Sequence, residues 1–251
     1  MAKWSFKKAK GFDIKVVKPN SYRMWQECER LEYNIFRTCG YIPVSKDKRL
    51  QFFNTYKRME FIAAYTCDGE IPRDDKQLLG ILRIIYPANT NQMLNEMLPT
   101  LRQARRLEYS QQDALANTSL KPPFEDNQTL WLYADAHDLA MRLNPKKCYD
   151  WATVGVTQEG QEKKVINGIF ARAVTRTWEQ PPLRYCFIAV DNEVYSRYKS
   201  KESNILNLGP SVMYWGSPTV PILIDFHKIA QGIQKLLIPV YRLKGYLGLS
   251  I

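Results

Sequence analysis

The sequence lacks the signals that would direct it out of the cell or into a membrane. The N-terminal stretch MAKWSFKKAKGF is basic and has no apolar run of roughly 7–15 residues like that of a signal peptide. No window approaches the ~18 uninterrupted apolar residues of a membrane-spanning helix. The five cysteines are odd in number and form no CxxC pair, so neither a disulfide framework nor a cysteine zinc site is indicated. These absences predict a soluble protein of the reducing cytoplasm.

Common catalytic motifs are missing as well. GxGxxG and GxxxxGK[ST] are both absent, which leaves a dinucleotide site or a P-loop with little support. Two histidines, His137 and His227, are too few for a convincing zinc site or a Ser-His-Asp triad, and no metal site is predicted. No repeat or Ser/Gly-rich linker divides the 251 residues. We therefore expect one domain over 1–251, with a basic tail at 1–11 and a C-terminal helix and tail at 227–251.

Positive charge is the feature that the chain has in excess. Lys and Arg number 36 against 25 Asp and Glu, giving a net charge of +11 and a pI near 9.4. Such a balance favours a polyanionic partner, which is a nucleic acid, an acidic protein or an anionic membrane surface, although it can also serve solubility alone. The 15 Tyr and 6 Trp could stack on bases, but no RNP, zinc-finger or helix-turn-helix signature is present. A basic nucleic-acid-binding protein remains an alternative, and no stable nucleic-acid complex is predicted.

Hydrophobic spacing predicts an alternation of strands and helices. Strands are expected at 12–17, 59–70, 78–88, 148–156, 184–191 and 220–226, the second and third forming a hairpin. Helices are expected at 21–40 with Gly40 as a C-terminal cap, at 93–109 with a break at Pro99, at 135–143 and 192–199 with Asp135 and Asn192 as N-caps, at 165–178 and at 227–237. This order favours an α/β (α+β) fold with a single mixed sheet and helices on its faces over a doubly wound parallel sheet.

One junction has a direct chemical meaning. The strand 148–156 leads into the polar stretch 158–163, expected to be a loop, and then into a helix. Unpaired N–H groups and the helix dipole at such a helix start favour a phosphate. Gly155 inside the strand is costly unless a ligand or another backbone approaches closely. Mere connection is the competing interpretation, and Glu159 and Glu162 weaken a pure phosphate cradle.

Six stretches carry a resemblance to a known family: LEYNIFRTCGY, LLGILRIIYP, VGVTQEGQEKKVINGIFARAV, RYCFIAVD, NEVYSRY and LGPSVMYWGSPTVPILIDF. Their order over most of 12–226 resembles the GNAT-fold acyltransferases, in the branch of acyl-homoserine-lactone synthases and N-acyl amino acid synthases. The resemblance implies a mostly antiparallel sheet with a V-shaped splay between its central strands. The family's R/Q-x-x-G-x-G/A loop is met only loosely at 158–163, and FFNTYKRME stands in place of the acidic cluster of the lactone synthases.

The resemblance implies an N-acyltransferase that moves a long-chain fatty acyl group from an acyl carrier protein or CoA thioester to an amino acid or similar small amine, with no tightly bound cofactor. The pantetheine arm would contact Val154, Gly155, Val156, Gln158, Gly160 and Gln161. Candidate bases are Asp150, Thr153 and Glu159, with Asp150 placed first, although Asp150 can equally end a loop or cap an element. A small-acyl CoA-dependent acetyltransferase, whose cavity would be too short for a long chain, is the alternative within the enzyme class.

The same resemblance suggests where the other substrates bind. Arg83 would hold the carboxylate of the acceptor, with Arg37 and Tyr56 as companions. Because Arg83 lies inside an apolar run, alternation alone allows it to face either solvent or a pocket. An acidic acyl carrier protein would contact Lys163, Lys164, Arg172 and Arg176, although these are also consistent with a solvated helix face. A lipid product implies peripheral membrane contact at its release, and a tunnel for its chain would be lined by aromatic and apolar side chains such as Trp131, Tyr133, Phe170, Met213, Tyr214 and Trp215.

Overall fold

The computed structural model describes residues 12–40, 58–66, 77–86, 104–107, 130–179, 183–199, 205–214 and 216–226. In chain order their elements are β1 (Phe12–Val17), α1 (Tyr22–Thr38), β2 (Met59–Thr66), β3 (Leu78–Ile85), β4 (Ala104–Leu107), β5 (Leu130–Tyr133), α4 (Ala134–Arg142), the 3-10 turn η2 (Pro145–Lys147), β6 (Cys148–Val156), α5 (Gln158–Glu162), α6 (Val165–Glu179), β7 (Tyr185–Asp191), α7 (Asn192–Lys199), β8 (Ile205–Asn207), β9 (Val212–Tyr214) and β10 (Ser217–Asp225).

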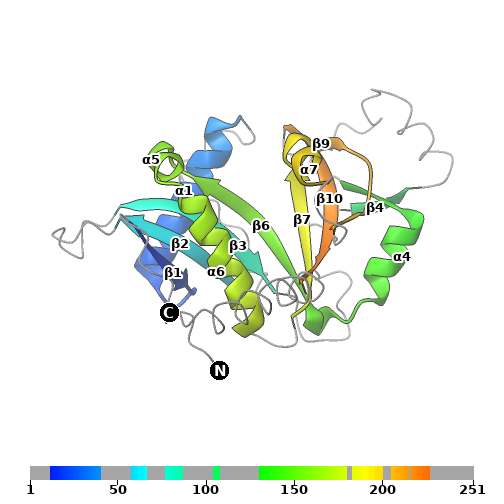
Figure 1. Cartoon of the computed structure of the whole chain (residues 1–251), viewed down its shortest axis with the longest axis horizontal. Helices are drawn as coiled ribbons and strands as arrows, with labels where there is room; N and C mark the ends of the chain where they lie inside the picture. The colour runs from blue at the N-terminus through cyan, green and yellow to red at the C-terminus, as the bar shows by residue number, and fades with distance from the viewer. Residues whose placement is uncertain are drawn as a thin grey trace, which may run out of the picture.

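Most of these strands join one mixed sheet (Figure 1). Its order is β1-β2-β3-β6-β7-β10-β8, and β9 pairs with β10 as well. The β6–β7 pair is parallel, and every other pair in this sheet is antiparallel. The strands β4 and β5 form a separate parallel pair. The predicted mixed, mostly antiparallel sheet is therefore confirmed.

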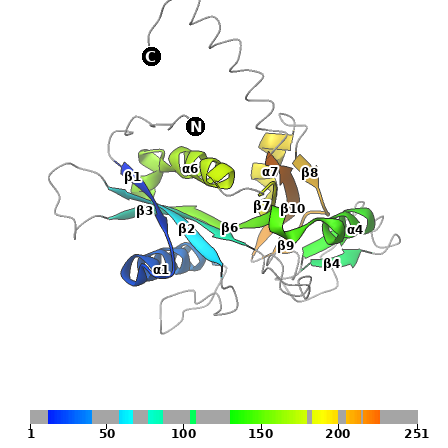
Figure 2. The same cartoon turned by 90° about the horizontal axis from the view of Figure 1, so that it is seen from below.

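Helices cover both faces of the sheet, so its middle strands are buried on two sides. Figure 2 shows α6 on one face and α1 on the other. The residues of β2 and β3 after the first of each strand are all buried, which explains why both strands read as nearly continuous apolar runs. One core cluster joins Phe12, Leu79, Tyr149 and Ile169 on the α6 side, and another joins Cys28 of α1 to its neighbours on the opposite side.

The helix α1 ends as its sequence predicts. Gly40 has a φ of +76°, in the left-handed region that favours glycine, and its N–H donates to the carbonyl oxygen of Arg37 at 2.9 Å. The helix buries Cys28, Glu32 and Tyr33. A glutamate on the buried face is the exception in this pattern, because a buried carboxylate requires a partner.

Three sequence predictions about element types were wrong. Residues 104–107, placed in a helix over 93–109, form β4, because pairing with β5 overrides their helical spacing. The stretch 158–163, expected to be a loop, contains the helix α5. The short strand β5 was not predicted, whereas β8 and β9 lie in the Gly- and Pro-containing stretch 204–226, where bent or edge strands are expected from the sequence. The rest of 93–109 and the predicted helix at 227–237 lie outside the described residues.

Two predicted helix caps were also wrong by one or more residues. The N–H of Glu193 is accepted by Asp191 Oδ1 at 2.8 Å, so Asp191 rather than Asn192 caps α7. Asp135 lies in the first turn of α4, and Tyr133 occupies the cap position. Such shifts are expected, because a carboxylate anywhere near a helix N-terminus interacts favourably with the dipole. None of the helices in the described part of the chain is long and apolar enough to cross a membrane.

Candidate active site

The parallel strands β6 and β7 pair along only part of their length. Cys148, Tyr149 and Asp150 pair with residues 185–187 of β7, and no later residue of β6 is paired with β7 among the described residues. Both strands nevertheless continue, β6 to Val156 and β7 to Asp191, and Figure 1 shows them diverging. We call residues 151–156 and 188–191 the two arms of a fork, and the last pair, Asp150 with Phe187, its apex. The predicted V-shaped splay is therefore confirmed.

Burial changes at the apex on both strands. Residues 148–150 of β6 are buried, whereas all but one of residues 151–156 are partly or fully exposed. On β7, Cys186 and Phe187 are buried and residues 188–191 are half-buried. Val154 is 44% exposed, which is unusual for a residue of a central strand. Because no strand in the described part of the chain pairs with either arm across the fork, the fork presents two strand edges, which are templates for binding an extended chain.

A β-bulge in the β6 arm reverses the direction of its side chains. Arg83 of β3 pairs with Thr153 and Ile84 pairs with Trp151, so Ala152 is an extra residue in β6. Residues two apart in a strand normally face the same side of the sheet. Here the Trp151 ring stacks on Phe170 of α6, with centroids 5.6 Å apart, whereas Thr153 contacts Arg83 on the α1 side.

Behind the bulge lies a buried cluster of three polar side chains. Glu32 Oε1 of α1 is 2.6 Å from Arg83 Nη2, which also donates to Thr153 Oγ1 at 3.4 Å. The three residues are 0%, 3% and 7% exposed. Burial raises the pKa of Glu32, and the Arg83 charge and the Thr153 hydroxyl oppose that rise.

Arg83 therefore faces neither solvent nor an open pocket. Alternation alone left these two alternatives open, the family resemblance favoured the pocket, and sequence reasoning missed Glu32 altogether. The sequence does contain a signal for this pair: Glu32 lies on the apolar face of a predicted helix, and Arg83 lies in an apolar strand. Two buried residues of opposite charge are best satisfied by pairing with each other. Of the other predicted acceptor contacts, Arg37 is exposed in the last turn of α1 and Tyr56 lies outside the described residues.

The predicted bases are not gathered at one point. Asp150 is fully buried at the apex of the fork. Glu159 lies beyond the far end of the same arm, in the first turn of α5, and its carboxylate is 2.9 Å from Lys163 Nζ. An extended strand rises about 3.3 Å per residue, so the six arm residues separate the two carboxylates by roughly 20 Å. Asp150 and Glu159 cannot serve the same reacting atoms.

The helix α5 is fastened to β3 where the β6 arm ends. The N–H and the hydroxyl of Thr157 both donate to the Leu79 carbonyl oxygen, at 2.9 and 3.1 Å. The N–H of Gly160 donates to Thr157 Oγ1 at 3.0 Å and that of Gln161 to the Thr157 carbonyl oxygen at 2.9 Å. These two N–H groups are therefore engaged, contrary to the expectation that they are open to a phosphate. Gln158 is exposed in the first turn.

Two glycines at the fork have packing reasons that the sequence did not reveal. A Cβ at Gly160 would overlap the Leu79 carbonyl oxygen, so glycine allows α5 to approach β3. A Cβ at Gly155 would overlap Ile35 Cδ1 of α1. The close approach inferred at Gly155 is thus made by the side chain of Ile35.

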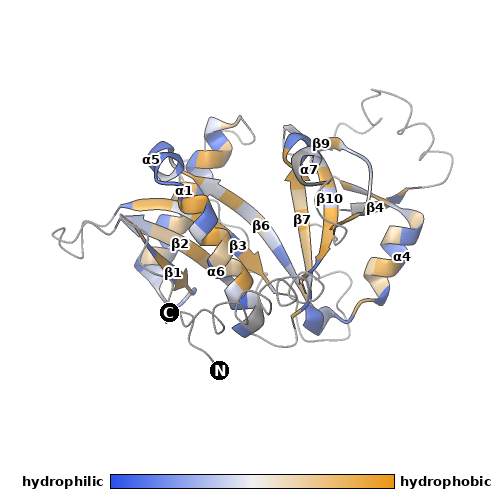
Figure 3. Ribbon diagram, viewed as in Figure 1, coloured by the Kyte–Doolittle hydropathy of each residue, from blue (hydrophilic) through white to orange (hydrophobic). Residues whose placement is uncertain are grey.

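Three of the four cations predicted to meet a carrier protein are paired within the chain. Lys163 contacts Glu159, Arg172 bonds to Glu179 at 2.8 and 3.2 Å, and Arg176 bonds to Glu60 at 2.7 and 3.0 Å. The fourth, Lys164, is exposed and has a φ of +54°. Figure 3 shows the hydrophilic character of α5, which precedes these residues.

The excess charge of the chain lies mainly at its two ends. The stretches 1–11 and 227–251 each contain four Lys or Arg and no Asp or Glu, so together they supply 8 of the net +11. Residues 12–226 hold the remaining 28 basic and 25 acidic residues, a net charge of +3. Most of the net positive charge is thus carried by the two terminal stretches rather than by residues 12–226.

The apolar residues proposed to line a tunnel lie on different sides of the sheet. Trp131, Tyr133 and Tyr214 pack in one cluster with Ala189 of the β7 arm. Phe170 packs on the α6 side against Trp151, Met213 is 38% exposed, and Trp215 lies outside the described residues. Of the residues of this set that the structure describes, Trp131, Tyr133 and Tyr214 adjoin the fork from the β7 side.

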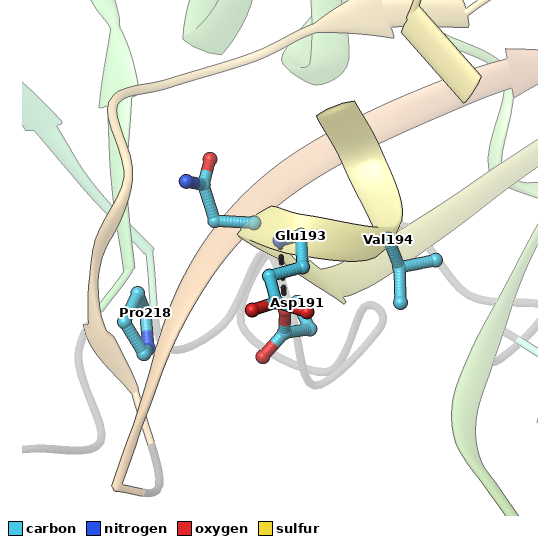
Figure 4. A pocket seen from close by; sticks show the side chains of 5 residues that line it. Asp191, Glu193, Val194 and Pro218 are labelled. Atoms are coloured by element: carbon cyan, nitrogen blue, oxygen red, sulfur yellow. Dashed lines mark hydrogen bonds between the residues drawn. The ribbon is translucent and has the colours of Figure 1, made fainter. Parts of the chain in front are cut away.

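A pocket of about 380 Å³ lies at the end of the β7 arm (Figure 4). It is lined by Asp191, Asn192, Glu193, Val194 and Pro218, none of which was predicted as a site residue. Its carboxylates make it unsuited to a phosphate. Within the described ranges no group of three or more His, Cys, Asp or Glu side chains is arranged to hold a metal ion.

Solved structures with the same fold are acyltransferases. The CoA-dependent acyl-homoserine lactone synthase BjaI, solved with SAM and isopentyl-CoA, matches with a TM-score of 0.51 and 13% identity over 86% of this chain and 84% of that chain. The lactone synthase LasI matches at 0.49 with 12% identity over 86% and 90%. FeeM, an N-acyl amino acid synthase from uncultured soil microbes, matches at 0.45 with 14% identity over 85% and 88%.

At these identities the likeness concerns the fold, and the TM-scores below 0.5 add no argument of their own. The chain has the mixed α/β fold of the BjaI acyltransferase. No family model matches the sequence, and no curated protein matches it. The substrates of the chain therefore have to be inferred from its own residues.

Proposed function

We propose that the chain is an N-acyltransferase that moves an acyl group from a pantetheine thioester to the amine of a small acceptor. The observation that carries the proposal is the fork: two parallel strands in the middle of a sheet separate after three residue pairs and leave the β6 arm partly exposed. A pantetheine arm is an extended chain with amide groups. Such a chain can pair with an unpartnered strand edge as an added strand does.

The fork also sets the orientation of the bound donor. Its phosphate end lies toward the exposed first turn of α5, beside Gln158, and its amides lie along Val154, Gly155 and Val156. The thioester is then closest to the apex and to Asp150. Gly160 and Gln161 contribute by fixing α5 rather than through their own N–H groups.

The reaction needs a base, and Asp150 is the candidate in position. The amine nitrogen attacks the thioester carbonyl carbon, the C–N bond forms and the C–S bond breaks. Asp150 takes a proton from the amine, directly or through one water, and the departing sulfur leaves as the thiol after receiving a proton. N–H groups of the fork stabilise the oxyanion. Thr153 is engaged by Arg83 and Glu159 is remote, so neither shares this role.

A long-chain acyl group is the finer proposal for the donor. The cluster of Trp131, Tyr133 and Tyr214 adjoins the β7 arm through Ala189, which supplies apolar surface next to the fork. An amino acid or similar small amine is the proposed acceptor. Arg83 is paired with Glu32, so an acceptor carboxylate would have to compete with Glu32 for it. A small-acyl CoA-dependent acetyltransferase is the second candidate, with the same fork and a shorter chain.

The proposal is tested by donor binding and by product analysis on the purified full chain. We expect calorimetry to show binding of CoA and of acyl-CoAs, and mass spectrometry to show N-acyl amines after incubation with donors of two to sixteen carbons and a mixture of amino acids and polyamines. A parallel series with acyl carrier protein as the donor decides between the two thioester sources. A preference for two-carbon donors would favour the acetyltransferase.

A matched pair of substitutions locates the donor. Val154→Trp places a large side chain on the β6 arm beside the fork, and Leu206→Trp places the same side chain on β8. Val154 and Leu206 are both strand residues that are 44% exposed. Only Val154→Trp should abolish CoA binding. Equal CoA affinity in the two variants, or no binding of any thioester by the native chain, would refute the proposed donor site.

A further inference from the structure

We propose that Glu32 of α1 is a positioning residue for the fork: acting through Arg83 and Thr153, it holds the bulged arm of β6 in place. The inference rests on the proposed function only for what the fork binds. Its structural part concerns the conformation of residues 151–156 and stands on the contacts of the described residues alone.

The β6 arm needs support from outside its own strand ladder. It has no pairing with β7 beyond the apex, and the bulge at Ala152 interrupts its pairing with β3. A bulged residue is left unpaired and the ladder is locally disrupted. Residues 153–156 remain paired with β3, so side-chain contacts from the two faces of the sheet supplement this one-sided ladder in fixing the arm.

The helix α1 supplies these contacts on one face. Glu32 reaches Arg83 at 2.6 Å, and Arg83 reaches the first residue after the bulge, Thr153, at 3.4 Å. One helical turn further on, Ile35 fills the space that Gly155 leaves open. Glu32 and Ile35 of α1 thus support two residues of the arm, Thr153 through Arg83 and Gly155 directly, and Val154 between them is 44% exposed.

The chemistry of the cluster favours positioning over stability. Replacing a buried ion pair by well-packed apolar side chains is often neutral or stabilising, so stability alone does not require a glutamate at position 32. An ion pair does provide direction: Arg83 must point at both Glu32 and Thr153 to be satisfied. That requirement sets the register of α1 against the arm.

The chain contains a matched control on the other face of the sheet. Glu60 of β2 is 3% exposed, accepts from Tyr86 Oη at 2.6 Å, and pairs with Arg176 of α6 at 2.7 Å. It is a buried glutamate paired with an arginine across a sheet–helix interface, as Glu32 is. None of these contacts involves the β6 arm.

The test compares Glu32→Gln with Glu60→Gln in the full chain, with amide hydrogen exchange of residues 151–156 and CoA affinity as readouts. Glu32→Gln should speed exchange in the arm and weaken CoA binding by about tenfold, the loss expected for one charged hydrogen-bonding group. Glu60→Gln should leave both unchanged, even where it lowers the unfolding midpoint equally. Equal exchange of 151–156 in the two variants would overturn the inference.

Thr153→Val provides a second variant in case Glu32→Gln does not fold. It removes only the hydroxyl link to the arm and leaves the Glu32–Arg83 pair intact. We expect faster exchange in 151–156 here too, and unchanged exchange would contradict the link. If the native chain binds no CoA, the proposed function fails, whereas the exchange comparison still decides the role of Glu32.

Discussion

The contact between α1 and the β6 arm can be tested by adding one methyl group at Gly155. Gly155 lies in the β6 arm, and a Cβ placed on it would overlap Ile35 Cδ1 and lie 3.2 Å from Cγ2 and 3.3 Å from Cγ1 of the same side chain. Real Cβ atoms rarely approach neighbours this closely, so Gly155→Ala forces either the isoleucine or the helix to move. The substitution therefore tests whether α1 is held firmly against the arm.

The expected magnitude follows from which atom is overlapped. Overpacking a well-packed core typically costs about 1–3 kcal/mol. The overlapped atom is a terminal methyl that can rotate away, which places the cost at the low end, and the gain from replacing a strand glycine by alanine offsets roughly 0.5–1 kcal/mol of it. The overlap itself therefore costs about 1 kcal/mol, and after the offset we expect Gly155→Ala to lower the free energy of unfolding by about 0.5 kcal/mol.

Ile35→Val removes the overlapping methyl and should reverse the effect. Alone it should cost about 0.5–1.5 kcal/mol, the usual loss for this change in a core. In the double variant the overlap is gone, so the combined cost should fall short of the sum by about 1 kcal/mol. Urea unfolding of the four chains measures this coupling energy.

The control uses a second glycine that faces away from α1. A Cβ on Gly80 of β3 would lie 2.8 Å from Val156 Cγ1 and 3.1 Å from Ile169 Cδ1 of α6. Gly80→Ala combined with Ile35→Val should therefore be additive. If Gly155→Ala and Ile35→Val are additive as well, α1 does not hold the arm as described, and the reasoning about its contacts is wrong.

Three further outcomes are expected. Gly160→Ala should cost about 3 kcal/mol or more in urea unfolding, because the overlapped atom is the backbone oxygen of Leu79, which cannot rotate away; a cost below that of Gly155→Ala would contradict this. Burial raises the pKa of Glu32. The native chain should therefore lose stability relative to Glu32→Gln as pH rises from about 4.5 through that raised pKa. If the free energies of unfolding of the two chains keep a constant difference over this range, the shift is contradicted. Deleting residues 227–251, which hold four cations and no acidic residue, should weaken binding to anionic vesicles by about tenfold or more while leaving binding to neutral vesicles low; unchanged binding would remove this stretch as the membrane contact.

The sequence predicted the elements that obey a local rule. The alternation of β6, the C-terminal glycine of α1 and the apolar runs of β2 and β3 each follow from short-range preferences, and the structure has them where expected. The fork itself was expected only from the family resemblance. Nothing in the residues of β6 or β7 marks where their pairing ends.

The features that were missed all depend on partners distant in sequence. The bulge at Ala152 is a property of register with β3, some seventy residues earlier, and strand β4 exists because β5 pairs with it. Gly155 and Gly160 were interpreted through a ligand, whereas their neighbours are Ile35 and Leu79. A single sequence shows that a position is unusual, but the contact that explains it comes from tertiary packing.

The internal pairing of these cations limits the electrostatic attraction that this face can offer to an acidic carrier protein. A carrier protein docking on Lys163, Arg172 and Arg176 would have to compete with Glu159, Glu179 and Glu60, which already occupy them at 2.7–2.9 Å. Surface pairs of this kind are worth little each, but Glu60 is buried, and removing its partner would leave an uncompensated charge. Of the four predicted cations, the exposed Lys164 therefore remains as a source of electrostatic recognition near the fork. Under the proposed function, charge on this face then does not by itself select a carrier protein over CoA, and we expect the choice of donor to depend on how each thioester fits the exposed edge of β6.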